Sequence, residues 1–245
     1  MGGRSKMTNK TSFGEIGWLT YEHNGREGAF AFPPIQGTHR NCYQKMKADS
    51  DVVPAEGLDL AILTEGAYTE NTPIWQNVKA DCFVSRYVRA PVRVLWVPHG
   101  NDLAGVLLER DLEGNGRKTK MKLPKNIDGW KKGENGVYES PDKNQIFVSE
   151  GSYKIGKHTK NSFAKDGFVT AVLTAEGAEI FARTAANAKL APWTWGFDVK
   201  DIKKSEQRVV YLSENGDWLN LSGDGWGGYY GGFAFGVRKE KGRAA

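Results

Sequence analysis

The chain has 245 residues, a formal net charge of +5 and a hydrophobic fraction of 39%. This length suits one large domain or two small ones, and two cysteines are too few for a disulfide-dense scaffold. No run of about 20 apolar residues indicates a membrane span, and no early apolar run resembles a signal peptide.

The N-terminal part predicts a flexible segment, a hairpin and one helix. Residues 1–10 are expected to be flexible and residues 11–245 to form a single domain. GWLTYEHNGREGAFAF predicts a hairpin around the turn Asn24-Gly25. Residues 37–51 are polar and predict a loop. Pro54 is expected to open a helix whose spacing aligns Leu58, Ile62 and Leu63.

The middle of the chain predicts short strands. The β-like runs are 83–87, 92–97 and 105–108, and a further hairpin turns at PDKN, residues 141–144. RKTKMKLPKNIDGWKK, residues 117–132, is strongly basic. We expect it to be a solvated hairpin edge in which lysines block edge-to-edge pairing. Nucleic-acid contact is the alternative, but no nucleic-acid-binding motif accompanies the run.

A helix is predicted over residues 174–190, because Ala178, Phe181, Ala182 and Ala185 form a narrow apolar stripe. Thr174 has the side chain of an N-cap. The hairpin RVVYLSENGDWLNL then precedes the glycine-rich loop GDGWGGYYGG, and FAFGVR is expected to be the final strand.

No catalytic or metal-binding motif stands out. The four histidines lack metal-ligand spacing, and those at the turns, His23 and His99, are expected to be solvated. Cys42 and Cys82 have no CxxC partner and are open to one bridge or two free thiols. There is no Walker loop, dinucleotide fingerprint or nucleophile elbow.

The segment from Tyr211 to Gly236 has the composition of a recognition surface. It mixes tyrosine with serine, glycine, asparagine and aspartate, which combines rigid contact area with adaptable hydrogen bonds. Tyr229 and Tyr230 are adjacent, so both cannot point inward from an extended chain. The segment holds three acidic residues and no lysine or arginine, which argues against a grip on phosphates.

The long helix, the Trp-rich connection after it, the glycine- and aromatic-rich region and the terminal GGFAFGVR together resemble the end of a C-type lectin fold. More narrowly, residues 193–239 resemble the variable proteins of diversity-generating retroelements, and related domains of formylglycine-generating enzymes. The resemblance implies an α+β, C-type-lectin-like mixed fold with short antiparallel strands, two helices and long irregular loops.

In that retroelement family, adenine-directed mutagenesis rewrites ligand-facing positions on a fixed scaffold. The resemblance therefore implies a variable region at about 209–238, with fixed scaffold residues at Trp218, Phe233 and Phe235. Trp226 fits the scaffold better than the variable set, because adenine mutation of Asn codons does not yield Trp. The implied ligand-binding residues are Tyr211, Ser213, Asn215, Asp217, Asn220, Ser222, Asp224, Tyr229 and Tyr230.

The expected function is therefore display of a diversified surface to a protein or cell-surface ligand, as in viral receptor binding or a microbial adhesin. Neither a cofactor nor specific nucleic-acid binding is expected, and the sequence leaves the location of the protein open, with a virion and a cell surface as the candidates. The calcium motifs of sugar-binding lectins do not occur, and no cysteine follows Cys82, so neither calcium-dependent sugar binding nor formylglycine-generating activity is expected. The alternatives are an enzyme of that branch with an unrecognised site, a fixed-specificity adhesin, and nucleic-acid binding through residues 117–132.

Overall fold

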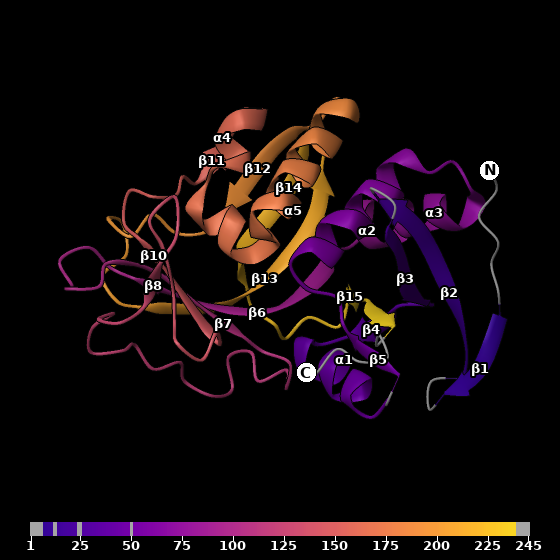
Figure 1. Ribbon diagram of the computed structural model, residues 1–245, viewed down its shortest axis with the longest axis horizontal. Helices are drawn as coiled ribbons and strands as arrows, with labels where there is room; N and C mark the ends of the chain where they lie inside the picture. The colour runs from indigo at the N-terminus through magenta and orange to yellow at the C-terminus, as the bar shows by residue number, and fades with distance from the viewer. Residues whose placement is uncertain (1–6, 12–13, 24–25, 50, 239–245) are drawn as a thin grey trace.

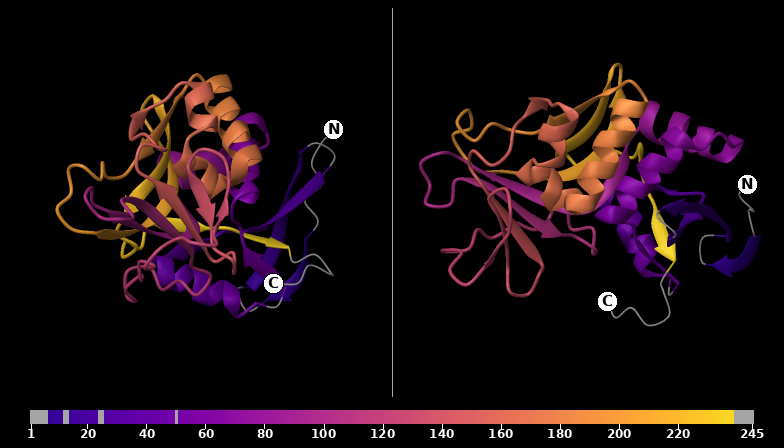
Figure 2. Two further views of the ribbon diagram at one scale, coloured as in Figure 1. Left: turned by 60° about the vertical axis from the view of Figure 1, so that its left-hand side comes forward. Right: turned by 45° about the horizontal axis from the view of Figure 1, so that its top comes forward.

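Two β-sheets and the helices packed against them form the part of the chain that the computed structural model describes, residues 7–11, 14–23, 26–49 and 51–238 (Figure 1). The smaller sheet lies at the opposite end of the molecule from residues 105–149 (Figure 2). Its strand order is β1 (Met7–Thr11), β2 (Gly14–His23), β3 (Arg26–Phe32), β16 (Gly236–Arg238) and β5 (Val52–Pro54).

The larger sheet has eleven strands. Its main path runs β11 (Gly156–Lys157), β12 (Ala191–Trp195), β14 (Trp218–Gly225), β13 (Glu206–Asn215), β6 (Val88–Val97), β7 (Gly105–Arg110), β10 (Gln145–Ser149), β9 (Val137–Glu139) and β8 (Lys131–Lys132). The short strands β15 (Gly232–Ala234) and β4 (Ile35–Gly37) join this sheet through β6. Most pairs are antiparallel, and β12 with β14 is parallel.

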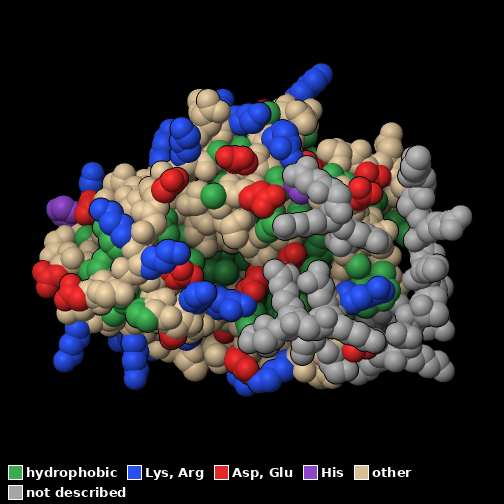
Figure 3. All heavy atoms as spheres, in the orientation of Figure 1, with side chains coloured by type: hydrophobic (Ala, Val, Ile, Leu, Met, Phe, Trp, Pro, Cys, Tyr) green, Lys and Arg blue, Asp and Glu red, His purple; other side chains and the backbone are tan. Residues whose placement is uncertain are grey.

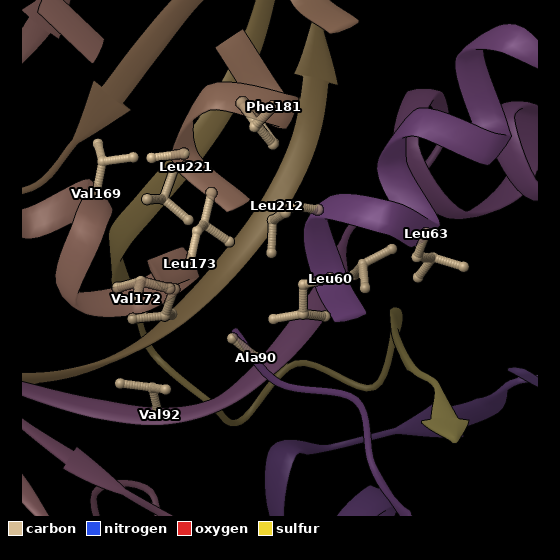
Figure 4. Packing of buried hydrophobic residues seen from close by; sticks show 14 of the residues in the cluster. Leu60, Leu63, Ala90, Val92, Val169, Val172, Leu173, Phe181, Leu212 and Leu221 are labelled. Atoms are coloured by element: carbon tan, nitrogen blue, oxygen red, sulfur yellow. The ribbon is translucent and has the colours of Figure 1, made fainter. Parts of the chain in front are cut away.

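The helical segments pack mainly on one side of the larger sheet. They are α1 (His39–Lys47), α2 (Leu58–Thr69), α3 (Pro73–Asn77), the π-helical segment η1 (Val78–Val84), α4 (Lys160–Ala164) and α5 (Gly167–Asn187). Figure 4 shows α2 and α5 directing apolar side chains at β6, β13 and β14. Leu173 and Phe181 from α5 meet Leu212 and Leu221 there, and all four are buried. This core fixes one face of β13 and β14.

The mixed α+β prediction is confirmed, and so are several elements. The hairpin β2–β3 forms, although its predicted turn at Asn24-Gly25 lies outside the described residues. The hairpins β9–β10 and β13–β14 form as predicted. Thr174 caps the second part of α5: its backbone leaves the helical region, and its hydroxyl accepts the N–H of Gly177 at 3.2 Å.

Other predictions of local structure are wrong. Residues 39–47, expected to be loop, form α1, which Thr38 caps by accepting the N–H of Asn41. Pro54 ends β5 rather than opening a helix, and α2 begins four residues later. The run 83–87 is not a strand, because its first part closes η1. The final segment divides into β15 and β16, one in each sheet.

The basic run 117–132 is mostly irregular rather than a hairpin edge. Only its last two residues are paired, as β8 at the edge of the larger sheet. Met121, which belongs to this run, is buried in a second apolar cluster with Leu95 and Phe147. The run therefore lies along the face of the sheet opposite α5, close to the end of β14.

Candidate functional site

The β13–β14 hairpin separates core positions from outward positions by simple alternation. Leu212, Leu219 and Leu221 are fully buried in the main core. Their neighbours Tyr211, Ser213, Asn220 and Ser222 lie on the other face, where Tyr211 pairs with Ser222 and Ser213 with Asn220. These four residues, all predicted to bind ligand, therefore lie on one face of the sheet.

Being on that face does not expose all of them. Asn220 is 1% exposed and Ser222 is 0% exposed, so their assignment to a displayed surface is corrected. The reason is position: β14 is paired on both sides, and larger neighbours, Trp193 beside Asn220 and Tyr211 beside Ser222, flank these short side chains. The Asn220 amide donates to the Ser213 hydroxyl at 3.5 Å.

Asn215 and Asp217 are exposed, but at the far end of the hairpin. They flank Gly216, whose φ of +59° forms the tight turn. Four residues along β13 separate Asn215 from Tyr211, which corresponds to about 13 Å, and Asp217 lies just beyond in the turn. These two residues therefore do not share a contact area with the tyrosines of the glycine-rich loop.

The glycine-rich loop carries the most exposed aromatic side chains of the described chain. Trp226 is 56% exposed, Tyr229 69% and Tyr230 71%. We call residues 226–231 the aromatic loop. The predicted display of Tyr229 and Tyr230 agrees with this exposure. Trp226, expected to be scaffold, is exposed as well.

The aromatic loop is held at both ends. At its start, Gly227 adopts a φ of +71° and its carbonyl accepts the N–H of His39 at 3.0 Å, so the loop passes beside α1 (Figure 1). Beyond its end, the N–H of Phe233 donates to the carbonyl of Tyr87 at 2.9 Å. These contacts restrict the backbone that carries the two tyrosines.

A buried arginine supports the middle of the loop. Arg89, on β6, is 2% exposed and donates to the carbonyl of Tyr229. It also donates to the carbonyl of Gly37 at 2.9 Å and to the hydroxyl of Tyr87 at 3.0 Å. The guanidinium thus ties the aromatic loop to β4 and β6 through its rigid fork of donors.

Tyr211 and Asp224 lie beside this arginine network. The Tyr211 hydroxyl donates to Asp224 at 3.2 Å, and its ring lies 5.0 Å from that of Tyr87. Burial raises the pKa of Tyr211 to about 12 and also raises the pKa of Asp224. Both side chains are half-buried, so they support the loop and contribute little contact area of their own.

Trp226 is flanked by two arginines. The guanidinium carbons of Arg117 and Arg208 lie 4.2 Å and 4.4 Å from its ring centroid. Arg208 is buried and pairs with Glu206 at 2.8 Å, whereas Arg117 is exposed at the start of the basic run. Cation–π contacts of this kind hold a partly exposed ring in one orientation.

A buried His39–Asp111 pair lies under the start of the loop. The His39 Nε2 and Asp111 Oδ2 atoms are 2.9 Å apart, and both side chains are 1% exposed. Burial lowers the pKa of His39 despite the carboxylate beside it, so we assign Nε2–H as the donor. Burial alone would raise the pKa of Asp111, but hydrogen bonds from His39 and from two backbone N–H groups, of Gly116 and Asn115, lower it. The pair fixes the loop at residues 114–116 against α1.

The predicted scaffold residues differ in burial. Phe235 is 1% exposed within the main core, while Phe233 and Trp218 are half-buried. Trp218 stacks on Trp193 with ring centroids 4.4 Å apart.

The expectation that the turn histidines are solvated is wrong for His23. This side chain is 8% exposed, and its Nδ1 atom lies 2.8 Å from the Oε2 atom of Glu65. His99 is exposed, and its Nδ1 atom lies 2.8 Å from the Oε2 atom of Glu150.

The cysteines and the acidic residues form no site of their own. Cys42 and Cys82 are free and buried, and burial raises their pKa values to about 11 and about 12. Within the described ranges, no group of three or more His, Cys, Asp or Glu side chains is arranged to hold a metal ion. None of the described helices is both long and apolar enough to cross a membrane.

Comparison with known proteins gives one likeness of fold. No protein-family model and no curated protein matches the chain. A solved structure, described as accommodation of massive sequence variation in Nanoarchaeota by the C-type lectin fold, aligns with a TM-score of 0.44 and 11% identity. The alignment covers 89% of this chain and 100% of that one. The likeness is to the fold alone, and no residue role is taken from it.

Proposed function

We propose that this chain is a ligand-binding protein that presents the aromatic loop to a protein or cell-surface target, as a viral receptor-binding protein or a microbial adhesin does. The exposure of Tyr229 and Tyr230, at 69% and 71%, is the observation that carries the proposal. Three large aromatic side chains are exposed within five residues of the chain, and exposed apolar groups gathered in this way often mark interaction sites.

The anchored backbone explains how the loop would bind tightly. Binding costs conformational entropy for every segment that becomes ordered. The bonds from His39 and Arg89 order the loop before a ligand arrives. Tyrosine side chains have few rotatable bonds, so the tyrosines add contact area at a small further cost.

We also propose that a retroelement diversifies this surface. The support is the residue composition of 209–232 and the alternation that separates core positions from outward ones. Side chains of Asn215, Asp217, Tyr229 and Tyr230 are exposed, so their replacement leaves the core unchanged. This proposal depends on sequence variation among copies of the gene.

We propose that this chain has no catalytic activity. A thiolate is the reactive form of cysteine, and the raised pKa values of Cys42 and Cys82 disfavour it near neutral pH. The buried His39–Asp111 pair has a structural role between α1 and the loop at residues 114–116, and it is closed to solvent. These features support a binding role.

The test is the double substitution Tyr229→Ala with Tyr230→Ala. Labelled protein would be mixed with cells of its source community and bound protein measured by flow cytometry. Removing both anchors should weaken binding about 30-fold or more, because interface tyrosines are common hot spots. The matched control, Tyr229→Phe with Tyr230→Phe, keeps both rings and should retain most binding. Undiminished binding by the alanine pair, with an unchanged melting temperature, would exclude the loop as the contact surface.

A further inference from the structure

Four arginines from distant parts of the sequence surround the aromatic loop. Arg117 and Arg208 flank Trp226, and Arg89 holds the carbonyl of Tyr229. Arg86 lies against the end of the loop, since a Cβ added at Gly231 would be 2.6 Å from its Nη1 atom. The loop itself contains no charge, so its electrostatic character is set by these neighbours.

Two of the four arginines have hydrogen-bond or ion-pair partners within the chain. Arg89 bonds to carbonyl and hydroxyl oxygens, and Arg208 pairs with Glu206. Arg86 and Arg117 are exposed, and neither forms an ion pair with any residue that the structure describes. The loop therefore has an unpaired guanidinium at each end.

The acidic residues of the same segment do not balance these charges. Glu214 accepts the Tyr68 hydroxyl at 2.7 Å, Asp217 lies at the far turn, and Asp224 accepts from Tyr211. The expectation that this segment does not grip phosphates considered only the charges within the segment, and not the charges that the fold brings beside it. In space, the guanidiniums of Arg86 and Arg117 lie against the loop, and neither has an ion-pair partner among the described residues.

Arg117 is prepared to bind a carboxylate. Its guanidinium carbon lies over the ring of Trp226, 4.2 Å from the ring centroid, and no carboxylate of the described residues pairs with it. A guanidinium edge matches a carboxylate through two parallel hydrogen bonds. The stack also restricts the side chain before binding, which lowers the entropy cost of the contact.

The basic run extends this positive region. The hydroxyl and the carbonyl of Thr119 accept hydrogen bonds from Arg93 at 2.6 and 3.0 Å, and Met121 is buried. The residues between and beside them, Lys118, Lys120 and Lys122, are exposed. The face over α4 and α5 shows basic and acidic side chains interspersed (Figure 3).

We infer that the aromatic loop binds an acidic protein segment. Arg86 and Arg117 take its side-chain carboxylates, Tyr229 and Tyr230 contact its apolar parts, and the lysines steer its approach. The inference rests on the proposed function of the loop and names the chemistry of its partner. A single-stranded nucleic acid fits less well, because it needs free aromatic faces for its bases, and two guanidiniums already cover the ring of Trp226.

The test uses three fluorescent probes with the full chain: a random copolymer of glutamate and tyrosine, poly-lysine, and oligo(dT) of about 16 nucleotides. Binding is measured by anisotropy at about 50 mM and about 200 mM salt. The acidic copolymer should bind most tightly, and more weakly at the higher salt concentration. Arg117→Gln should weaken its binding at least about fivefold, a loss that only the minority of energetically important interface residues produce.

Two further variants make the result specific. Arg117→Lys keeps the charge but loses the planar fork, so it should bind more weakly than the native chain with a similar salt dependence. Lys160→Gln, on α4, removes the same charge in mixed surroundings and should bind as the native chain does. The melting temperature of each variant is measured, and binding is compared only among variants that melt at the same temperature as the native chain.

Three results would overturn the inference: tighter binding of oligo(dT) than of the copolymer, no copolymer binding at about 50 mM salt, or equal effects of Arg117→Gln and Lys160→Gln. The proposed function fails separately. If the tyrosine pair is needed for binding to cells while Arg86→Gln and Arg117→Gln are not, the loop remains the contact surface and its partner is not acidic.

Discussion

Asp166 shows how one side chain joins helix capping to the pH dependence of stability. One carboxylate oxygen accepts the N–H of Val169 at 3.1 Å, and the other accepts the N–H of Lys154 at 2.7 Å. It therefore caps α5 and fixes the chain before α4. Burial nevertheless raises its pKa to about 6, because the ionised form loses its water.

The pKa of Asp166 is higher in the folded state than its unfolded value of 3.8, and this difference sets the direction in which stability changes with pH. The folded state binds the proton more tightly, so this stabilisation is fully present below pH 3.8 and is lost as the pH rises through about 6. Asp166→Ser keeps a capping oxygen and removes the titration. The variant should lack the decline of about 3 kcal/mol in unfolding free energy across this window. Urea titrations at closely spaced pH values measure it, and an unchanged decline would assign it to another group.

Individual exposures were only partly predictable from the sequence. Tyr229 and Tyr230 were predictable because adjacent residues between glycines cannot both enter a core. Asn220 and Ser222 are polar, yet their strand is paired on both sides and larger side chains stand beside them. His23 ends a strand at a turn, but it packs against Glu65, a residue 42 positions away. Burial by distant neighbours leaves no local signal.

At the scale of elements, a clear turn signal predicted each correct hairpin. The turns at 141–144 and 214–217 carry asparagine, aspartate or glycine between apolar runs. Helix α1 was missed because HRNCYQKMK is mostly polar, and its apolar residues are buried through contacts with elements distant in sequence, among them β5 and β15. The segment at 83–84 was mistaken for a strand because its side chains favour both a strand and a buried helical turn.

The alternation in β13 and β14 predicts which codons vary if the gene is diversified. Leu212, Leu219 and Leu221 face the core and should be constant. Gly223 should be constant too, because a Cβ there would lie 2.7 Å from Phe168 and 2.9 Å from Trp96. Substitutions should gather at Asn215, Asp217, Tyr229 and Tyr230.

Deep sequencing of codons 209–238 in the source population measures this pattern. The codons for residues 88–97 in β6 serve as a constant reference within the same gene. Substitutions spread equally over core and outward positions would contradict the structural argument. A uniform sequence would remove the support for diversification and leave an adhesin of fixed specificity.

At the scale of the whole molecule, the C-terminal segment joins the two sheets. β15 pairs with β4 and β6 in the larger sheet, and β16 pairs with β3 and β5 in the smaller one. The same long-range arrangement brings Arg86, Arg89, Arg117 and Arg208 to the aromatic loop. In the sequence, the aromatic loop and the basic run are separate segments. They form one surface because the fold brings them side by side.

Phe235, between β15 and β16, tests whether the chain folds as one unit. It is 1% exposed in a core that includes Phe30 of the smaller sheet and Val88 of the larger one, and its carbonyl accepts the N–H of Ala55 at 2.9 Å. Phe235→Ala should lower the unfolding free energy by about 3–5 kcal/mol, the usual cost of removing a buried phenylalanine ring. Phe233→Ala, two residues away and half-buried, should cost less.

Because the core that contains this ring includes side chains of both sheets, the loss should appear as a shift of one cooperative transition. Tryptophan fluorescence reports on both sheets, through Trp18 in β2 and Trp96 in β6, and far-ultraviolet circular dichroism reports on the backbone. Coincident curves that move together would establish a single folding unit. Two separate transitions, with only one moved by Phe235→Ala, would instead divide the chain between its sheets and confine the aromatic loop to the larger one.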